Sequence, residues 1–521
     1  MWQVGWREHV WSSIEGPWDI VVIGGGITGA GVLSLASHMG LSALLLEKSD
    51  FASGTSSASG KMVHGGLRYL KQGQVRLTWY SVRERERLIA EGRGLVDPMG
   101  FLLATYKGDR PGSAMYKAGL VLYDMMAGRC THKYYPASEF LRLAPHVRSA
   151  GLLGGFGYVD ARTDDSRLVL RVIREAVRRG AAALNYAMVE ELTKTASGQV
   201  DGVVVRNVVS HETARVKASV VVNAAGAWAD GIREQVGRRP RLRPLRGSHL
   251  LFPSWRVPVA QAMTFLHPAD RRPLYVLPWE NATLLGTTDV FHDRSPDDCR
   301  ISAREFDYLM DAATYLFDRL DLTPEDVICT FSGVRPVVGT GKLDPSRESR
   351  EHVVFKESGL VTATGGKLTT FRLLAADAMA ATGMLPRTKT TRAQVRALDE
   401  VNAFSDAPDR LLGRYGSDAG RVLECAREGE LSEIPGTPYL WAELRWAARA
   451  EGVVRLEDLL MRRLRLGLLL PSGGADLLPR IRAVVQPELG WSDERWEIEA
   501  TAYQKCWRSN HAPDLSGTKG G

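Results

Sequence analysis

The hydrophobic positions near the N-terminus predict a strand, a helix and a second strand in close succession. Residues 19–23 form a short run rich in β-branched side chains, and the three glycines at 24–26 break it. Residues 27–39 are small and apolar, a glycine ends them, and residues 44–47 form a second apolar strand. Although residues 20–46 contain no Asp, Glu, Lys or Arg, this order is typical of a buried βαβ unit rather than of a transmembrane helix.

The glycines of this unit have the spacing of a dinucleotide-binding turn. Gly24, Gly26 and Gly29 follow the first strand and open the helix. The first glycine permits the tight turn, the second lets the backbone approach a pyrophosphate, and the third lets the helix pack on the strand. Glu47 ends the second strand, where an acidic side chain bonds ribose hydroxyls. The arrangement favours dinucleotide binding over the alternative, a tight turn in an ordinary α/β core.

Two later strands end in the same kind of small-residue turn. Residues 220–223 are apolar and run into the small residues of 224–228, and residues 359–364 run into Gly365, Gly366 and Lys367. Each turn by itself is equally well explained as the end of a sheet strand. Together with the first turn, they favour a large flavin dinucleotide over a compact NAD site.

The composition limits the class of protein. With 521 residues, 44% of them hydrophobic and 24% charged, the chain is globular rather than disordered. That length accommodates roughly two to four domains at about 150 residues each. The 52 glycines exceed the usual share without any collagen-like period, so they belong to turns and close backbone approaches.

The net charge and the cysteine content limit the classes of partner and the cellular compartment that are expected. The net charge of +7 comes without the Lys/Arg blocks that bind nucleic acid, so no nucleic-acid partner is expected. A mildly basic solvated surface explains it, and an anionic substrate or an acidic membrane are the alternatives. The five cysteines are scattered singly, which predicts neither a disulfide framework nor a metal site and fits a reducing cytoplasm.

Several segments together resemble the signature of the FAD-dependent glycerol-3-phosphate dehydrogenases. They are residues 55–70, 158–160, 165–170, 246–249, 286–289, 332–336 and 365–370, and the resemblance resumes at 442–445 and 458–463. It therefore runs from about residue 17 to about residue 385 and into the C-terminal part. Gly60 departs from the family, which usually has Ser there, and Thr28 stands where Asn or Asp is frequent.

The resemblance implies an α/β fold in which a Rossmann-type FAD-binding domain interleaves with an α+β substrate domain. The oxidoreductase part is expected over residues 17–395, and an all-helical C-terminal cap domain over 400–515. The FAD segments are expected near 17–80, 150–245 and 350–385. The substrate segments, with a mixed or antiparallel sheet, are expected near 81–149 and 246–349.

The cofactor implied by the resemblance is FAD. The residues expected to contact it are Gly24, Gly26, Ile27, Thr28, Gly29, Glu47, Lys48, Thr55, Ser56, Ser57, Lys61, His64, Gly65, Gly66, Val189, Ala225, Gly226, Gly366, Lys367, Leu368 and Thr369.

The implied reaction is oxidation of sn-glycerol 3-phosphate to dihydroxyacetone phosphate, with a hydride passing to flavin N5. It needs a base near neutrality, and His64 and His249 are the candidates, each with a structural role as the alternative. It also needs a clamp for the phosphate, because arginine matches phosphate oxygens bidentately. The candidates for substrate binding are Arg335, Arg68, Arg350, Tyr69 and Lys367. Arg335 and Arg68 are also counted as catalytic, and the charge of Lys367 could stabilise the reduced flavin.

Family members of this type pass electrons to a membrane quinone, so a bilayer surface is an expected partner. Residues 439–485, with eight arginines, and residues 2–18, with four tryptophans, are candidate membrane contacts, and an ordinary domain interface is the alternative for both. A homodimer is also expected, in the cytoplasm or held peripherally on the inner face of the plasma membrane.

Other activities compete with this interpretation. A glycerol-3-phosphate oxidase that uses oxygen differs only in its acceptor. An amine, amino-acid or 2-hydroxy-acid oxidase of the same superfold explains the dinucleotide motif but not Arg68 and Arg335. A non-catalytic flavin-binding protein does not explain why the histidines and arginines of the signature are present together.

Overall fold

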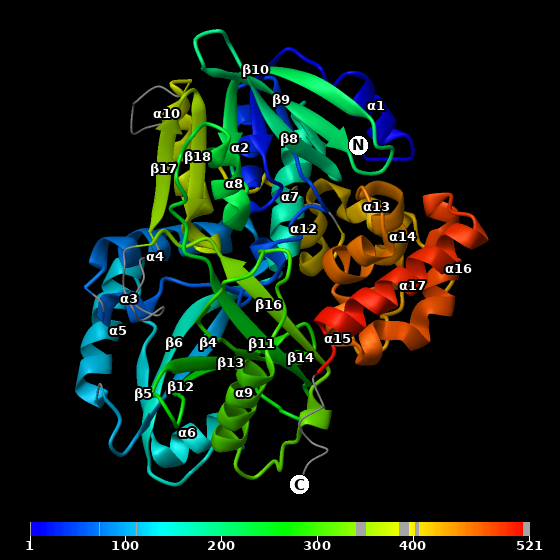
Figure 1. The fold of residues 1–521 in the computed structure, drawn as a ribbon. Helices are drawn as coiled ribbons and strands as arrows, with labels where there is room; N and C mark the ends of the chain where they lie inside the picture. The colour runs from blue at the N-terminus through cyan, green and yellow to red at the C-terminus, as the bar shows by residue number, and fades with distance from the viewer. Residues whose placement is uncertain are drawn as a thin grey trace.

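The computed structural model describes residues 2–71, 73–110, 112–339, 351–384, 395–401 and 406–513, with the side chains of Arg68 and Lys71 left out. Within these ranges the chain forms two sheets and a helical C-terminal part (Figure 1). The first sheet lies at the top of the view, the second at the bottom, and the C-terminal helices, coloured orange and red, lie beside both. The mixed α/β fold with a helical C-terminal domain confirms the fold class predicted from the sequence.

The first sheet carries the predicted βαβ unit at its centre. Its strand order is β17 (His352–Glu357), β18 (Leu360–Gly365), β10 (Thr213–Asn223), β1 (Trp18–Ile23), β2 (Ala43–Leu46) and β7 (Ala182–Leu184), and β9 (Val200–Asn207) pairs with β10 and with β8 (Ala187–Lys194). The strands from β18 to β7 run parallel, and β17 is antiparallel. α2 (Ile27–His38) contacts α7 (Asp165–Arg178) and α10 (Phe371–Thr382). Buried strand residues of β1 and β2, such as Ile20 and Leu45, are fully covered, as parallel sheets require.

The second sheet is mixed and mostly antiparallel. Its strand order is β15 (Val290–Phe291), β11 (Leu245–Pro253), β14 (Ala282–Gly286), β13 (Pro273–Trp279), β12 (Ala262–Leu266), β4 (Val96–Tyr106), β6 (Leu152–Thr163) and β3 (Met62–Val63), with β16 (Cys329–Arg335) on β11 and β5 (Lys133–Pro136) on β6. The helices α3 (Leu67–Lys71), α4 (Val75–Glu91), α5 (Ser113–Ala127), α6 (Ala137–Leu143) and α9 (Ala303–Leu316) belong to this half (Figure 1).

Strand pairing differs from the expected segments at two places. The sequence assigned residues 150–163 and 62–63 to FAD segments, but β6 pairs with β4 and β3 pairs with β6 in the second sheet. The reason is that β4 and β6 form a long antiparallel pair, and nothing in the local pattern of β6 shows which strand it will meet. The chain therefore crosses to the first sheet after Thr163 in this region, at the start of α7.

Helices and turns make up described residues 406–513. They are α12 (Asp409–Tyr415), α13 (Ala419–Glu424), α14 (Trp441–Ala450), a π-helical turn (Asp458–Arg463), α15 (Leu466–Leu469), α16 (Leu478–Leu489) and α17 (Asp493–Asn510). Their core is continuous with that of the second sheet, since Phe331 of β16 and Leu468 of α15 lie in one buried cluster. Two further α-helices of the described residues are α1 (Trp6–Ser12) and α8 (Ala229–Glu234).

Parts of both stretches proposed for membrane contact are covered by the protein itself, although α1 has no buried residue. Trp2 is buried and its ring stacks on Phe51, 5.0 Å away. In residues 439–485, Arg462 and Arg463 are buried in ion pairs with Asp50. These contacts support a domain interface for Trp2 and for the two buried arginines, and contact with a bilayer stays a prediction for both stretches. Among the described helices, none combines the length and hydrophobicity that crossing a bilayer requires.

Candidate active site

A cavity of about 1540 Å³ lies between the two sheets. Its walls come from the carboxyl ends of β1, β10 and β18, from the loop after β2, and from β13 and β16 of the second sheet. A pocket for one drug-sized ligand measures about 300–1,000 Å³. The cavity therefore has room for a long ligand and for a second, smaller one at its end.

The dinucleotide turn forms one end of this cavity. Gly24 has φ +108°, and a Cβ there would lie 2.6 Å from the carbonyl oxygen of Ala224. A Cβ on Gly29 would lie 1.9 Å from the carbonyl oxygen of Gly24, which explains why this helix packs so closely on its strand. The turn opens onto the N-terminus of α2, where helix geometry favours a bound anion.

Glu47 lies beside this turn at the end of β2. Its carboxylate accepts hydrogen bonds from the backbone N–H of Gly25 at 2.7 Å and of Ser49 at 2.8 Å. Burial raises its pKa, and these backbone donors oppose the rise. Because Glu47 also lines the cavity, it stands where the sequence places an acceptor for ribose hydroxyls.

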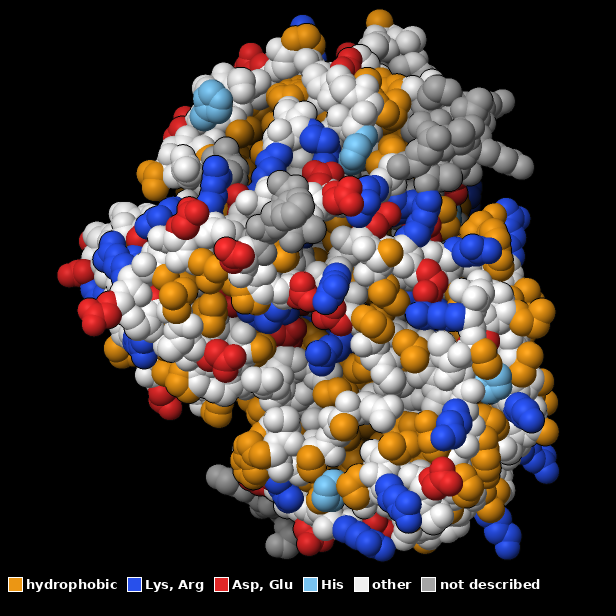
Figure 2. All heavy atoms as spheres, turned by 180° about the vertical axis from the view of Figure 1, so that it is seen from behind, with side chains coloured by type: hydrophobic (Ala, Val, Ile, Leu, Met, Phe, Trp, Pro, Cys, Tyr) orange, Lys and Arg blue, Asp and Glu red, His pale blue; other side chains and the backbone are white. Residues whose placement is uncertain are grey.

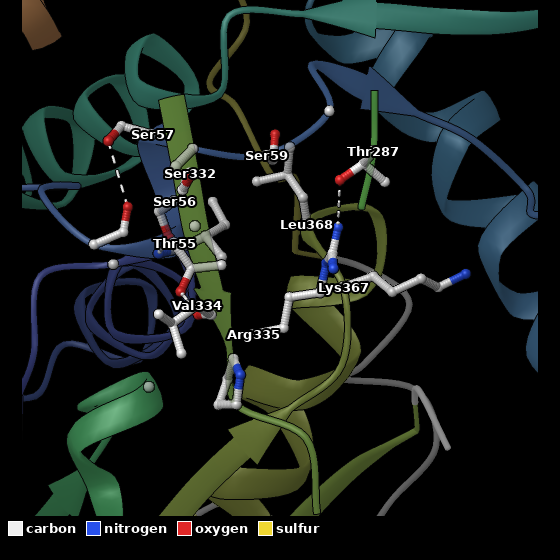
Figure 3. Close-up of a pocket in the computed structure, with 18 of the residues that line it drawn as sticks. Thr55, Ser56, Ser57, Ser59, Thr287, Ser332, Val334, Arg335, Lys367 and Leu368 are labelled. Atoms are coloured by element: carbon white, nitrogen blue, oxygen red, sulfur yellow. Dashed lines mark hydrogen bonds between the residues drawn. The ribbon is translucent and has the colours of Figure 1, made fainter. Parts of the chain in front are cut away.

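Most residues expected to contact the cofactor line this cavity. They are Gly24, Gly26, Ile27, Thr28, Glu47, Lys48, Thr55, Ser56, Ser57, His64, Gly66, Val189, Ala225, Gly226, Gly366, Lys367, Leu368 and Thr369. Thr55 donates a hydrogen bond to the carbonyl of Val334, which ties the serine-rich loop to β16 (Figure 3).

Three expected residues lie outside the cavity wall. Gly29 packs helix on strand, as described above. Gly65 is buried and donates its N–H to Tyr123 Oη at 2.8 Å. Lys61 is fully buried, and its Nζ lies 2.8 Å from Asp165 and donates to the carbonyl of Ser57 at 2.6 Å. Lys61 therefore supports the loop from behind, and its burial lowers its pKa to about 8.

Arg335 lines the opposite end of the cavity. Its guanidinium donates to Asp289 Oδ1 at 2.6 Å and to Thr287 Oγ1 at 3.0 Å, and Figure 3 shows it facing Thr287. Asp289 also pairs with Arg272, whose NH2 lies 2.8 Å from Oδ2. Two guanidinium groups thus share one carboxylate at this end of the cavity.

Lys367 places another cation in the cavity, next to the ring of Tyr69. The Lys367 ammonium donates to Ser81 Oγ at 2.6 Å and lies 4.2 Å from the centre of the Tyr69 ring. Both side chains line the cavity. Of the other clamp candidates, Arg350 lies outside the described residues, and only the backbone of Arg68 is described, in α3.

His64 faces the cavity from the loop before α3. Its backbone N–H donates to Thr369 Oγ1 at 3.3 Å, which joins this loop to the turn after β18. Burial, and then the charge of Lys367, lower its pKa to about 4. The imidazole is consequently neutral at pH 7 and free to accept a proton.

His249 occupies a different position. It is 1% exposed on β11, does not line the cavity, and stacks on Phe331 with ring centres 4.6 Å apart. Its Nε2 lies 3.0 Å from the hydroxyl of Tyr275, which does line the cavity. Burial, and then the charge of Arg335, hold the pKa of His249 well below its usual value. The structure thus separates the two base candidates.

Arg272 and Tyr275 are among the cavity residues that the sequence did not predict. They lie on and beside β13, outside every motif that carried the resemblance. Asp289 stood inside one such motif but without an assigned role. The only local signal for Tyr275 was an aromatic residue in a strand. The pairing of β11, β14 and β13 brings Tyr275 to His249.

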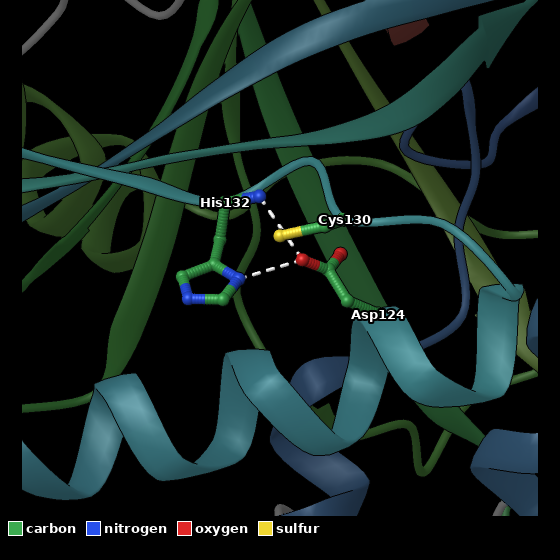
Figure 4. A group of neighbouring side chains, drawn as sticks. All are labelled: Asp124, Cys130 and His132. Carbon is green, nitrogen blue, oxygen red and sulfur yellow. Dashed lines mark hydrogen bonds and ion pairs between the residues drawn. The ribbon is translucent and has the colours of Figure 1, made fainter.

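Asp124, Cys130 and His132 are close enough to be considered as metal ligands, with ligand atoms within 4.8 Å of one another (Figure 4). The Asp124 carboxylate already accepts hydrogen bonds from Thr131 N at 2.9 Å, Thr131 Oγ1 at 2.9 Å, His132 N at 3.1 Å and His132 Nδ1 at 2.6 Å. These hydrogen bonds stabilise the turn between α5 and β5, and we assign the three residues to that turn.

Known proteins resemble the chain over nearly all its length. The family model described as FAD dependent oxidoreductase matches residues 19–372, and that described as the C-terminal domain of alpha-glycerophosphate oxidase matches residues 376–496. The aerobic glycerol-3-phosphate dehydrogenase of Staphylococcus aureus is 34% identical over 492 residues, 88% of this chain and 88% of that protein.

Two solved structures are also similar. The glycerol-3-phosphate dehydrogenase of Bacillus halodurans complexed with FAD superposes with a TM-score of 0.77 at 29% identity, covering 98% of both chains. The L-alpha-glycerophosphate oxidase of Mycoplasma pneumoniae with FAD bound has a TM-score of 0.56 at 16% identity, over 71% of this chain and 95% of that one, which is a likeness of fold alone.

The residues present fit FAD. At the turn of Gly24 and Gly26, a Cβ would fill the space that a pyrophosphate needs, since a Cβ on Gly26 would lie 3.0 Å from Ser56 Oγ. The cavity then continues without a break past Ser57 and His64 to Arg335. On these grounds FAD is the cofactor, and the chain belongs to the family of FAD-dependent glycerol-3-phosphate dehydrogenases.

Proposed function

We propose that the protein oxidises sn-glycerol 3-phosphate to dihydroxyacetone phosphate with FAD, and that the electrons go on to a membrane quinone. The observation that carries this proposal is one cavity that joins a dinucleotide turn to a neutral histidine, His64, and a basic end at Arg335. The similarity to glycerol-3-phosphate dehydrogenases over most of the chain supports the choice of substrate.

The basic end supplies the phosphate site. A phosphate dianion requires donors, and Arg335 presents a planar fork that matches two phosphate oxygens. Arg272 shares Asp289 with Arg335, so the two guanidinium groups are held in place before the substrate arrives. Lys367 adds a third positive charge to the same cavity.

His64 supplies the proton acceptor. A neutral imidazole in the cavity wall can take the proton of the C2 hydroxyl as the carbonyl forms. Lys367 and burial keep His64 unprotonated, so the acceptor is ready at neutral pH. FAD, when bound, supplies the oxidant that accepts the hydride from C2 at flavin N5.

Helix α5 supports the proposal that a membrane quinone accepts the electrons. Met115, Ala118, Leu122 and Met125 recur at intervals of three and four residues, so they share one face of the helix. Met115 is 63% exposed and Met125 is 74% exposed, and Met115 and Leu122 also form part of the cavity wall. An apolar helix face that borders the cavity gives a quinone dissolved in a bilayer a short route to the flavin.

Basic side chains accompany this apolar face. Lys117 on α5 and Arg76 and Arg83 on the neighbouring α4 are exposed. In Figure 2, seen from behind, the side of the molecule that carries α5 lies at the right, where hydrophobic side chains are interspersed with Lys and Arg. Apolar and basic residues in one surface support docking on an anionic bilayer.

An anaerobic experiment tests the substrate. The yellow holoenzyme should bleach on addition of sn-glycerol 3-phosphate, and absence of bleaching at millimolar substrate would remove the proposal. Reoxidation then tests the acceptor. A quinone should restore the yellow colour much faster than oxygen, whereas stoichiometric peroxide at the same rate in air would make the protein an oxidase.

A vesicle experiment tests the surface. Met125→Glu combined with Val121→Glu should reduce co-sedimentation with phosphatidylglycerol vesicles and slow reduction of quinone in those vesicles. Ile498→Glu on α17 is the matched control, because Ile498 is 56% exposed on another element. Equal binding by both proteins would show that α5 is not the docking face.

A further inference from the structure

The contact between His249 and Tyr275 is built by two glycines. His249 on β11 and Tyr275 on β13 both pair with Gly286 of β14, the strand between them. A Cβ on Gly286 would lie 2.2 Å from His249 Cδ2. A Cβ on Gly60 would lie 2.0 Å from Tyr275 Oη, so Gly60 makes room for the hydroxyl. Substituting either glycine would disturb this pair.

The Tyr275 hydroxyl shares a hydrogen bond with His249. Burial raises the pKa of Tyr275, which therefore keeps its proton, and burial keeps His249 neutral. With the imidazole proton on Nδ1, toward the backbone of Phe331, the neutral ring accepts the phenolic O–H at Nε2, 3.0 Å away. Donation to His249 leaves the lone pairs of Tyr275 Oη for the cavity, where they can accept a hydrogen bond.

The spacing of residues along β11 relates the Tyr275 hydroxyl to the proposed phosphate site at Arg335. Gly247 and His249 are two residues apart and lie on the same face of the strand, about 6.6 Å from one another by strand rise. The Arg335 guanidinium lies over Gly247, because a Cβ there would be 2.2 Å from its NH2. Arg335 and the His249–Tyr275 pair therefore lie at neighbouring positions on one face of β11, an interval of the same order as a three-carbon chain.

We propose that Tyr275 selects the substrate by accepting a hydrogen bond from its terminal hydroxyl, the one at the end opposite the phosphate. His249 is the positioning residue that fixes the Tyr275 oxygen over Gly60. A phosphate does not suit this place, since a dianion needs donors and the Tyr275 proton is committed to His249. This inference rests on the proposed function for its substrate, but its test does not depend on turnover.

Binding of two unreactive ligands tests the proposal. 3-Hydroxypropyl phosphate and propyl phosphate both lack a C2 hydroxyl and differ only in the terminal one. Titration calorimetry with the wild-type holoenzyme should show about tenfold tighter binding of the hydroxylated ligand, the worth of one hydrogen bond. In Tyr275→Phe this ratio should fall to about one, while the affinity for propyl phosphate stays unchanged.

Further variants separate a specific contact from a structural role. Gly60→Ser with Tyr275→Phe places a hydroxyl in the vacated space and should restore part of the preference. Gly60→Ser alone should lose it, because its Cβ displaces the tyrosine oxygen. Tyr308→Phe is the matched control: Tyr308 is another tyrosine beside a histidine, stacked on His267 outside the cavity, and the ratio should stay at the wild-type value.

The results distinguish the two proposals. An unchanged ratio in Tyr275→Phe, or an equal loss of affinity for both ligands, overturns the role of Tyr275. If Tyr275→Phe fails to fold, the ratio in Gly60→Ser decides the same question. Absence of bleaching with sn-glycerol 3-phosphate in the wild type refutes the proposed function, and the ligand ratio still reports on Tyr275.

Discussion

Replacement of Arg465 by methionine tests whether the C-terminal domain holds the loop that borders the cavity. Arg465 is buried between Asp164, at 3.1 Å from its Nε, and Asp165, and it donates to the carbonyl of Ser57 at 3.2 Å. Lys61 and Arg414 are the other cations that pair with these carboxylates. Arg465→Met therefore leaves two buried carboxylates with one partner fewer.

The expected cost is large because the pair is fully buried. Removing one partner of a buried ion pair destabilises a protein by about 3–5 kcal/mol. With a urea slope of about 3 kcal/mol per M, the unfolding midpoint should fall by about 1–1.7 M. The matched control is Arg482→Met, whose partners Asp493 and Glu497 are exposed and whose loss should cost about 0–1 kcal/mol.

The pH dependence provides a second check. Burial alone raises the pKa of Asp164, but Arg465 and then Arg414 outweigh it and hold that pKa below its usual value. A carboxyl with a depressed folded pKa stabilises the protein above its unfolded pKa, about 3.9, and this contribution is lost as pH falls toward the folded pKa. Losing Arg465 raises the Asp164 pKa, so the stability gap between wild type and variant should be constant at pH 6–8 and narrow below about pH 5.

The assay is urea unfolding of the holoenzyme, followed by far-UV circular dichroism and by FAD fluorescence. Because Arg465 reaches the Ser57 carbonyl, FAD fluorescence should rise at a lower urea concentration than helix loss in the variant. An Arg465→Met protein as stable as Arg482→Met, or a gap that widens on acidification, would refute the reasoning.

Three further predictions concern the cavity. Arg335→Ala should raise the KM for glycerol 3-phosphate at least tenfold while bound FAD, read from its absorbance, stays near one per chain; an unchanged KM means that the clamp lies elsewhere. The activity of the wild type should fall as pH drops through about 4, the pKa of His64, because the base is then protonated, and Lys367→Met should move this acid limb to higher pH by removing a positive neighbour. Gly29→Ala should yield colourless protein, since its Cβ would lie 1.9 Å from the Gly24 carbonyl, and full FAD content would contradict the packing role of that glycine.

Local sequence patterns were enough to predict most of a set of residues that line one cavity. The turn of Gly24, Gly26 and Gly29 needs only neighbours a few residues away, because a strand, a tight turn and a helix N-terminus are all short-range features. The signature at 55–70 likewise places His64 and Tyr69 together within one loop and helix. Gly24, Gly26, His64 and Tyr69 all line the cavity between the two sheets.

Long-range pairing decided the rest. Lys61 looks like a cofactor ligand in the sequence, yet the approach of Asp165 from α7 buries it behind the loop. The arginines of 439–485 were candidates for a membrane contact, but Arg463 pairs with Asp50 of the loop after β2 and is buried. A charge has no defined environment until the partner that neutralises it arrives from elsewhere in the chain.

The same division separates the two histidines. In the sequence alone, His64 and His249 are equivalent candidates, because both stand in motifs that resemble those of a flavin enzyme. Only the register of β11, β14 and β13 put Tyr275 between His249 and the cavity, with Gly286 and Gly60 leaving space for the contact. Strand register depends on pairing between residues far apart in the chain, so no local pattern along β11 carries that information.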